Sequence, residues 1–194
     1  ARPNETWQSD FTHVRLANNA DILVLNFLDD HSRLLLSCTA HHRITSPTVV
    51  EAFSRAAETH GFPQSSLTDN GLVFTSRFQR GRNAYEILLA RLGIEQKNSR
   101  PNHPQTQGKI ERFHQTLKKW LAARPKAHTL AELQALLDQF RIVYNNERPH
   151  RALEGRTPQD AYTSRPKATP SLDTDFEVFR PLTSKVDPSG SVTI

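Results

Sequence analysis

The segment from residue 22 to residue 28, which reads Ile-Leu-Val-Leu-Asn-Phe-Leu, most limits what this chain can fold into. A nearly continuous apolar run of this length is typical of a strand that is buried on both faces of a sheet. Residues 7–14 and 34–39 have strand-like patterns on either side of it, and the turn cluster 29–32 is short. These short connections predict an antiparallel meander of three strands.

The pattern then changes from strand to helix. Ser46 can cap a helix that has Pro47 at its first position, and Gly61 and Pro63 can end it. A short strand at 65–68, a helix at about 83–92 and a strand at 94–97 are expected next. The sequence therefore predicts an α/β fold, with helices on the faces of a mixed five-stranded sheet that combines the antiparallel meander with parallel strands.

Two longer helices complete the expected fold. After a polar loop at 98–107, a helix is expected from about Thr106 to Ala123. Its apolar stripe has helical spacing: Ile110, Phe113, Leu117, Trp120 and Leu121. Thr129 and Glu132 form a capping-box pattern that opens the last helix. The buried stripe expected for that helix is Leu130, Leu133, Leu136, Leu137, Phe140 and Tyr144.

Length and composition describe one substantial domain with an appendage. The domain is expected to span residues 1–162, and 163–194, rich in Pro, Ser, Thr and Asp, is expected to be an extended tail or the start of a truncated region. No apolar run approaches the roughly 20 residues of a membrane span, and the single cysteine, Cys38, excludes an internal disulfide. Because the 194 residues begin with Ala and contain no Met, we expect them to be a fragment of a longer protein. The single cysteine fits a reducing compartment, and we expect this protein to be cytoplasmic.

The positive charge is concentrated in one segment. The chain has a net charge of +5. Between Glu95 and Lys126 eight basic residues face two acids, a local charge of +6, so the remainder is close to neutral at −1. Such a segment favours a polyanionic partner, most plausibly nucleic acid. A solvated helix face would explain the same pattern about equally well.

Three acids stand in different settings. Asp10 lies inside an apolar strand, Asp69 follows a strand in Asp-Asn-Gly, and Glu111 lies on a helix beside basic residues. Alone, each has an ordinary explanation: a polar position on an edge strand, a turn former, and a charge on an amphipathic helix. Together they could ligate two Mg²⁺ ions through oxygen, which would offset their mutual repulsion. Such a pair of ions supports in-line phosphoryl displacement.

The motifs around these acids resemble the catalytic core of DDE transposases and retroviral integrases, which has an RNase H-like fold. The matching segments are Trp7–Thr12, Asp69–Gly71 and Pro104–Glu111. A fourth segment, Tyr144–His150, is similar to the bacterial insertion-sequence branch. The resemblance covers about residues 5–162. It implies a mixed five-stranded sheet, two divalent ions (Mg²⁺ or Mn²⁺), DNA ends and target DNA as substrates, and a homo-oligomer built on a dimer.

The resemblance also implies roles for single residues. Asp10, Asp69 and Glu111 would be the catalytic metal ligands. The residues that would contact DNA are Asn70, Gln107, Lys109, Arg112, Lys118 and Lys119. Two departures stand out: 41 residues separate Asp69 from Glu111, more than is usual in the family, and the helix-turn-helix region of a full transposase is not in this sequence.

The resulting prediction is a bacterial transposase core, acting at the nucleoid, that cleaves and joins DNA by metal-dependent phosphoryl transfer. Two alternatives stay open: an RNase H-like nuclease that only hydrolyses, and a non-catalytic DNA-binding module derived from a transposase. Of the other polar residues, Asp29 and Asp30 are expected to serve the turn rather than a metal. The histidines form no obvious ligand set, although His114 lies three residues after Glu111.

Overall fold

A computed structural model describes residues 2–76, 81–98 and 108–170 of the protein. Its strands are β1 (Thr6–Arg15), β2 (Asp21–Asp29), β3 (Leu35–His41), β4 (Ser65–Thr68) and β5 (Glu95–Asn98). Its α-helices are α1 (Ser46–His60), α2 (Ala84–Arg91), α3 (Gly108–Ala122), α4 (Leu130–Asn146) and α5 (Pro158–Thr163). A short 3-10 turn, Arg151–Leu153, lies between α4 and α5. The five strands form one sheet in the order β3-β2-β1-β4-β5, which confirms the predicted fold class.

The sheet changes direction at its centre. β1 pairs antiparallel with β2 and parallel with β4, while β3 extends the antiparallel half and β5 the parallel half. The pairing places Asp10 opposite Asn26, and it places Ser9 beside Thr68. Asp10 follows Ser9 and Asp69 follows Thr68 on two neighbouring parallel strands. The topology alone therefore brings these two acids to the same end of the strands.

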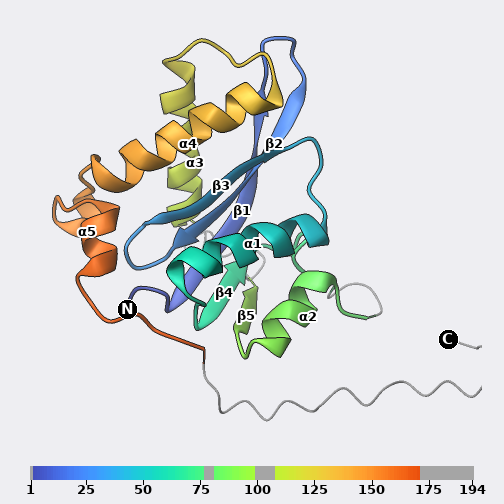
Figure 1. The fold of residues 1–194 in the computed structure, drawn as a ribbon, viewed down its shortest axis with the longest axis vertical. Helices are drawn as coiled ribbons and strands as arrows, with labels where there is room; N and C mark the ends of the chain where they lie inside the picture. Colours follow the sequence, from blue (N-terminus) through green and yellow to red (C-terminus); the bar gives the residue numbers. More distant parts are fainter. Residues whose placement is uncertain (1, 77–80, 99–107, 171–194) are drawn as a thin grey trace, which may run out of the picture.

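Helices cover both faces of this sheet (Figure 1). On one face α1 and α2 pack on odd-numbered residues of the central strands, with Trp7, Phe27 and Phe53 in edge-to-face contact. On the other face α3 and α4 pack on even-numbered residues such as Val24 and Leu28. Because side chains alternate along a strand, each central strand contributes to both cores. The predicted burial of the run 22–28 on two faces is confirmed.

Two of the predicted helix starts differ in detail. The side chain that caps α1 is Thr45, one residue before the predicted Ser46, because Thr45 has the extended backbone that a capping residue needs. Thr129 caps α4 as predicted, accepting from Glu132 N. The Glu132 carboxylate, however, accepts from the backbone of His128 rather than from that of Thr129. The reciprocal bond of a capping box is thus shifted outward by one residue.

Helix α4 also covers the exposed edge of the sheet. The side-chain amide of Asn145 accepts from Leu35 N at 2.9 Å and donates to Leu35 O at 3.0 Å. Gln134 accepts from Ala40 N and donates to Cys38 O. These two amides satisfy backbone groups of the edge strand β3 that would otherwise be open to pairing with another chain. The segment Tyr144–His150 therefore has a structural role as well as any functional one.

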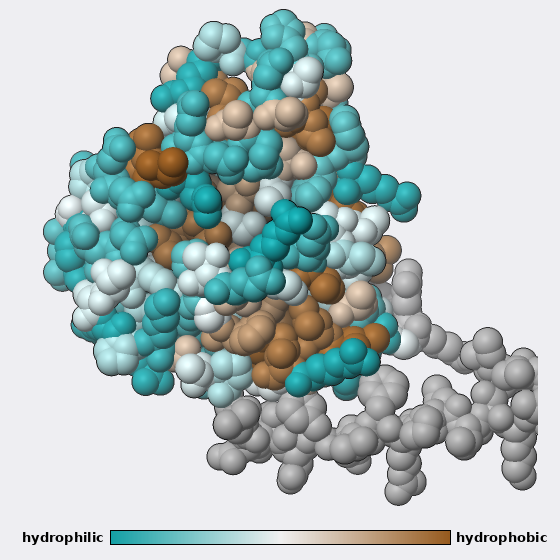
Figure 2. Space-filling model, viewed as in Figure 1, coloured by the Kyte–Doolittle hydropathy of each residue, from teal (hydrophilic) through white to brown (hydrophobic). Residues whose placement is uncertain are grey.

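The chain continues along the domain after α5. Ala168 is buried and donates to Pro3 O, and Lys167 donates to His60 O. Of the expected tail, residues 163–194, the structure describes 163–170, and 171–194 lie outside the described residues. On the face shown in Figure 2, hydrophilic residues dominate, with a hydrophobic area around α1 and α2 and a smaller one over α4. None of the helices in the described part of the chain is long and apolar enough to cross a membrane.

Candidate active site

Asp10 is the most buried of the three predicted acids. Its side chain is 21% exposed, and Asp10 Oδ1 accepts from Phe11 N at 2.8 Å. Burial raises the pKa of the Asp10 carboxyl to about 6, which the bond from Phe11 opposes. The negative charges of Asp69 and Glu111 raise this pKa further. The three carboxylates are thus near enough to repel one another, and Asp10 bears the cost.

Asp69 begins the turn that follows β4. Its Oδ1 accepts from Gly71 N at 2.9 Å, a side-chain turn that holds the carboxylate against its own backbone. Gly71 O then accepts from Phe74 N and Thr75 N, so the backbone turns sharply away from the sheet. The turn role that Asp-Asn-Gly suggested is confirmed. It also fixes the direction of the Asp69 side chain next to Asp10.

Glu111 lies in the first turn of α3 and is exposed. α3 packs on β1 through Ile110, Phe113 and Leu117, which are buried. This packing brings Glu111 toward the strand that carries Asp10. Among residues 2–76, 81–98 and 108–170, no three His, Cys, Asp or Glu side chains lie close enough together to form a ready-made metal site. The acids are neighbours, but they are not gathered into one ligand set.

The histidine that follows Glu111 completes the surroundings of Asp10. His114 Nδ1 lies 3.9 Å from Asp10 Oδ2, and Asn26 Nδ2 lies 3.1 Å from His114 Nε2. Asn26 Nδ2 also donates to Val24 O, which makes Nδ2 the donor to His114. Burial, aided by the charge of Lys118, lowers the pKa of His114 to about 4, so the ring is neutral at pH 7. Its remaining proton is then on Nδ1 and faces Asp10.

Two family profiles, both described as Integrase core domain, match residues 1–104 and 92–158. The chain belongs to the integrase core family. It is 29% identical over 175 residues to the 31.7 kDa protein of insertion element IS407 from Burkholderia multivorans, covering 90% of this chain and 61% of that protein. It is 28% identical over 162 residues to the transposase of insertion sequence IS904 from Lactococcus lactis, covering 81% of this chain and 61% of the transposase.

Solved structures share the fold of this integrase core chain. The HTLV-2 integrase catalytic core domain in complex with magnesium matches with a TM-score of 0.65 and 20% identity, covering 83% of this chain and 97% of that chain. A chain of the simian T-cell lymphotropic virus intasome, solved in complex with PP2A regulatory subunit B56 gamma, matches with a TM-score of 0.69 and 23% identity, covering 88% of this chain and 60% of that chain. The resemblance inferred from the motifs is therefore confirmed at the level of family and fold. The chain spans about three fifths of the length of the two insertion-element proteins, 61% in both cases.

The basic residues predicted to contact DNA do not form one surface of the integrase core. Lys118 lies near His114, on the side of α3 that faces the acids. Arg112 and Lys119 line a hollow between α3 and α4. Asn70 follows Asp69 and is partly buried, and the predicted contact Gln107 lies outside the described residues.

Lys109 is engaged with the protein itself. Its ammonium lies 2.6 Å from Asp30 Oδ2, and Gln8 Nε2 donates to the other oxygen of the same carboxylate. Asp30 thus ties the start of α3 to β1. Neighbouring Asp29 has the expected turn role: it is buried and accepts from Ser32 N and Oγ. The sequence had suggested a turn role for both acids, and the contact of Asp30 with α3 was not foreseen.

Asn26 is the site residue that sequence reasoning missed. It is fully buried in β2, and its Oδ1 has no hydrogen-bond partner in the described part of the protein. Buried polar groups are nearly always bonded, so an unbonded oxygen beside His114 marks a strained or functional position. The sequence did contain a signal that could have identified this residue, because Asn26 is the only polar residue in the apolar run 22–28. Cys38 lies in the core, and its burial raises the pKa of its thiol.

The close approach at Gly71 yields a prediction. A Cβ on Gly71 would lie 2.9 Å from Asp69 Oδ1, so Gly71→Ala must turn the carboxylate aside. Because only the end of a flexible side chain moves, we expect the thermal midpoint to stay nearly unchanged. If the chain is the transposase core that the sequence predicts, metal-dependent DNA cleavage should fall by about 10- to 100-fold, because misplacing a group of the site by about 1 Å can cost up to about 100-fold. Full activity in Gly71→Ala would show that the direction of the Asp69 carboxylate is unimportant.

Proposed function

We propose that this chain is the catalytic core of a bacterial transposase, which cleaves DNA strands and joins their 3′ ends to target DNA by metal-dependent phosphoryl transfer. The observation that carries the proposal is that the Asp10 carboxylate is largely buried at the end of β1, with two further acids nearby. Its pKa is raised to about 6, chiefly by burial and further by the negative charges of Asp69 and Glu111. A fold that spends stability on burying a carboxylate beside two other acids is explained if cations bind there.

The donor set fits divalent magnesium or manganese. Asp10, Asp69 and Glu111 offer oxygen alone, the ligand type that hard cations prefer. These three side chains would hold the ions, with Glu111 moving toward the pair formed by Asp10 and Asp69. Two such ions, when bound, would activate the attacking oxygen and stabilise the leaving oxygen. A magnesium complex of the HTLV-2 integrase core, a protein of the same fold, supports the choice of ion.

The residues of the chain itself supply position and charge. Neutral His114 would orient Asp10 through its Nδ1 proton, and Asn26 would hold that tautomer. Lys118 would bring positive charge to the face of α3 that carries Glu111, where a phosphate would bind. Lys109, released from Asp30, and Asn70, Arg112 and Lys119 would add the DNA contacts that the resemblance implies. Of these groups, Lys118 and Asn70 are the ones that would contact a DNA strand lying at the acids.

Partners and boundaries follow from the same proposal. The substrates would be the ends of a mobile element and target DNA, and the active form would be a homo-oligomer built on a dimer. Homologous folds support this, because the HTLV-2 core was solved in dimeric and trimeric forms. We propose residues 1–162 as the catalytic core and 163–194 as a tail, in a protein of the bacterial cytoplasm. Insertion-element relatives support that location.

The direct test uses a branched DNA that mimics the product of strand transfer. The 3′-hydroxyl of the broken target strand attacks the phosphodiester at the branch, re-forms the intact target strand and releases the 3′-hydroxyl of the element strand. One phosphodiester forms as one breaks, so no other reactant is needed. We expect the rejoined strand in Mg²⁺ or Mn²⁺ and none in EDTA. Hydrolysis without rejoining would favour the nuclease alternative, and no metal-dependent turnover by the full-length protein would favour the non-catalytic module.

A further inference from the structure

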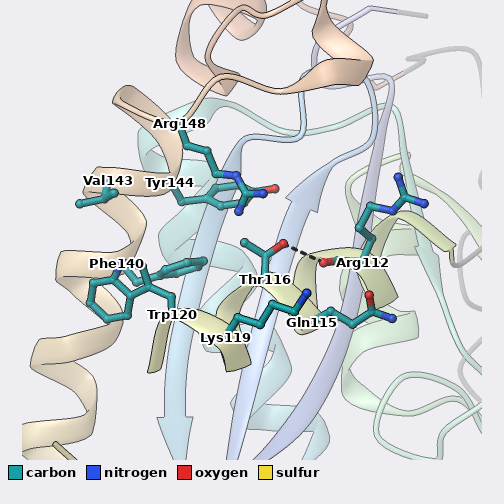
Figure 3. A pocket seen from close by; sticks show the side chains of 9 residues that line it. All are labelled: Arg112, Gln115, Thr116, Lys119, Trp120, Phe140, Val143, Tyr144 and Arg148. Carbon is teal, nitrogen blue, oxygen red and sulfur yellow. Dashed lines mark hydrogen bonds between the residues drawn. The ribbon is translucent and has the colours of Figure 1, made fainter. Parts of the chain in front are cut away.

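A long groove runs between α3 and the end of α4, away from the acids. It consists of two adjoining hollows, of about 570 and 600 Å³, that share Arg112, Thr116, Tyr144 and Arg148 in their walls. We call their combined lining the α3–α4 groove. Figure 3 shows the first hollow, with side chains from both helices around it and the Arg148 guanidinium beside the Tyr144 ring. Its floor is the packed core, since Phe140 and Tyr144 are only 2% and 3% exposed.

The α3–α4 groove carries positive charge without compensation. Its basic lining residues are Arg33, Lys109, Arg112, Lys119, Arg148 and Arg151. No Asp or Glu is among the described residues that line it. Lys109 is paired with Asp30, but in the described part of the chain no ion pair involves the five arginine and lysine side chains that remain. Cations gathered without carboxylates repel one another, and an anionic ligand would remove that repulsion.

A buried donor of Arg33 points to the same conclusion independently of the surface charge. Within the described residues, Arg33 Nη1 and His150 Nε2 are buried and have no hydrogen-bond partner. Both residues line the second hollow. Buried guanidinium donors are rarely left unbonded, because the loss of hydration is not offset. An oxygen-rich anion entering the hollow would supply the missing acceptor for Arg33.

The groove and the acids occupy different sides of α3. Successive helical residues are turned by about 100°, so Arg112, Thr116 and Lys119 share one side, while Glu111 and Lys118 share another. Arg112 and Lys119 are seven positions apart, about 10 Å along the helix, which is the axial rise of about three nucleotides of one DNA strand. A DNA segment in the groove would therefore be separated by the helix from the strand at the acids.

We propose that the α3–α4 groove binds the phosphate backbone of a second DNA segment, distinct from the strand that is cleaved. A backbone is favoured over an acidic peptide because the cations are spread along the groove, from Lys119 to Arg151, rather than gathered at one point. Cations that are spread along a groove suit the regularly repeated charges of a phosphate backbone. The proposal takes from the proposed function only that DNA is the ligand. A joining reaction brings two DNA segments together, and the α3–α4 groove would bind the second segment.

The test measures binding without catalysis, using the full 194-residue chain in EDTA. The affinity for a labelled duplex of random sequence is measured by fluorescence anisotropy over a range of salt concentrations. The double variant Arg148→Gln with Arg151→Gln is compared with wild type. Both side chains are exposed and hold no hydrogen bond within the described residues, so the fold should be kept. We expect the affinity to fall about 10-fold or more and the salt slope to decrease by about two, one for each lost phosphate contact.

Matched variants make the result specific. Arg91→Gln removes a similar charge from exposed α2, on the other side of the sheet, and should leave affinity and slope close to wild type. The double variant Arg148→Lys with Arg151→Lys should keep most of the affinity. An equal loss in Arg91→Gln would mean that only net charge matters, and an unchanged slope in the glutamine double variant would overturn the proposal. Loss of binding to polyglutamate but not to DNA would assign the groove to an acidic protein instead.

The design separates this proposal from the catalytic one. Binding in EDTA does not require the acids to hold metal. If branched DNA is never rejoined but the groove variants still lower DNA affinity, the proposed function is wrong and DNA binding in the groove is supported. If rejoining occurs but the groove variants bind DNA like wild type, the groove fails and the function stands.

Discussion

Asp10→Asn, Asp69→Asn and Glu111→Gln are each expected to lower rejoining of branched DNA by at least about 1,000-fold. Each change keeps the shape of the side chain and removes the negative charge that would hold a divalent cation. Losing an electrostatic group aimed at a transition state commonly costs about 100- to 1,000-fold, and loss of an ion removes several such interactions. We therefore expect activity at or near background in all three variants.

The measurement is the initial rate of rejoining in Mg²⁺ and in Mn²⁺, beside a check of the fold by circular dichroism. Glu58→Gln is the matched control: Glu58 is exposed on α1, which packs on the opposite face of the sheet from α3, so its loss should not change the rate. Substantial metal-dependent rejoining by any one of the three variants would remove that residue from the proposed set. Loss of activity together with loss of the fold would show a structural role instead.

Local patterns in the sequence predicted most of the architecture. The run 22–28 identified the central buried strand, and Gly61 and Pro63 marked where α1 ends. These features depend on neighbours within a few residues, where periodicity and turn chemistry act. Helix caps proved less certain: Thr45 and Ser46 are both good caps, and only the backbone conformation decides between them.

The site was predictable in its acids and much less so in its surroundings. Asp10 and Asp69 are 59 positions apart, and the sequence could place them together only through the resemblance. The contacts of Asn26 with His114, of Lys109 with Asp30 and of Asn145 with β3 span 79 residues or more. Such contacts depend on how helices dock, which no local pattern encodes. These long-range contacts hold the side chains of the site in position, whereas the sequence alone supplies only the candidate residues.

The basic segment illustrates the same limit. In sequence it is a single stripe from Glu95 to Lys126 that carries +6. Folded into α3, it divides into a side near the acids and a side that lines the α3–α4 groove. Arg33 and Arg148, far away in sequence, then join the second side. Charge counting suggested a polyanionic partner, and the packing of α3 against α4 creates the second basic surface on which the proposed groove rests.

Asp10→Asn is also expected to stabilise the protein when no divalent cation is present. The pKa of Asp10 is raised from 3.8 to about 6 in the folded state, chiefly by burial. A raised pKa means that the folded state disfavours the carboxylate relative to the unfolded state. The cost is absent below about pH 3.8, grows through the window up to about pH 6, and is complete above it. A shift of about two pKa units corresponds to at most about 3 kcal/mol.

The free energy of unfolding should therefore fall as the pH rises from 5 to 7.5 in wild type, relative to Asp10→Asn. Urea unfolding in EDTA at both pH values measures this difference, and Glu58→Gln should behave like wild type. Equal pH dependence in wild type and Asp10→Asn would show that Asp10 bears no such cost. Adding Mg²⁺ should then raise the stability of wild type but not of Asp10→Asn, because an ion that binds only the folded state at 100 times its Kd contributes about 2.7 kcal/mol. A carboxylate that destabilises the empty fold and is relieved by a cation is the behaviour expected of a metal ligand, and an ordinary buried ion pair would give the opposite sign.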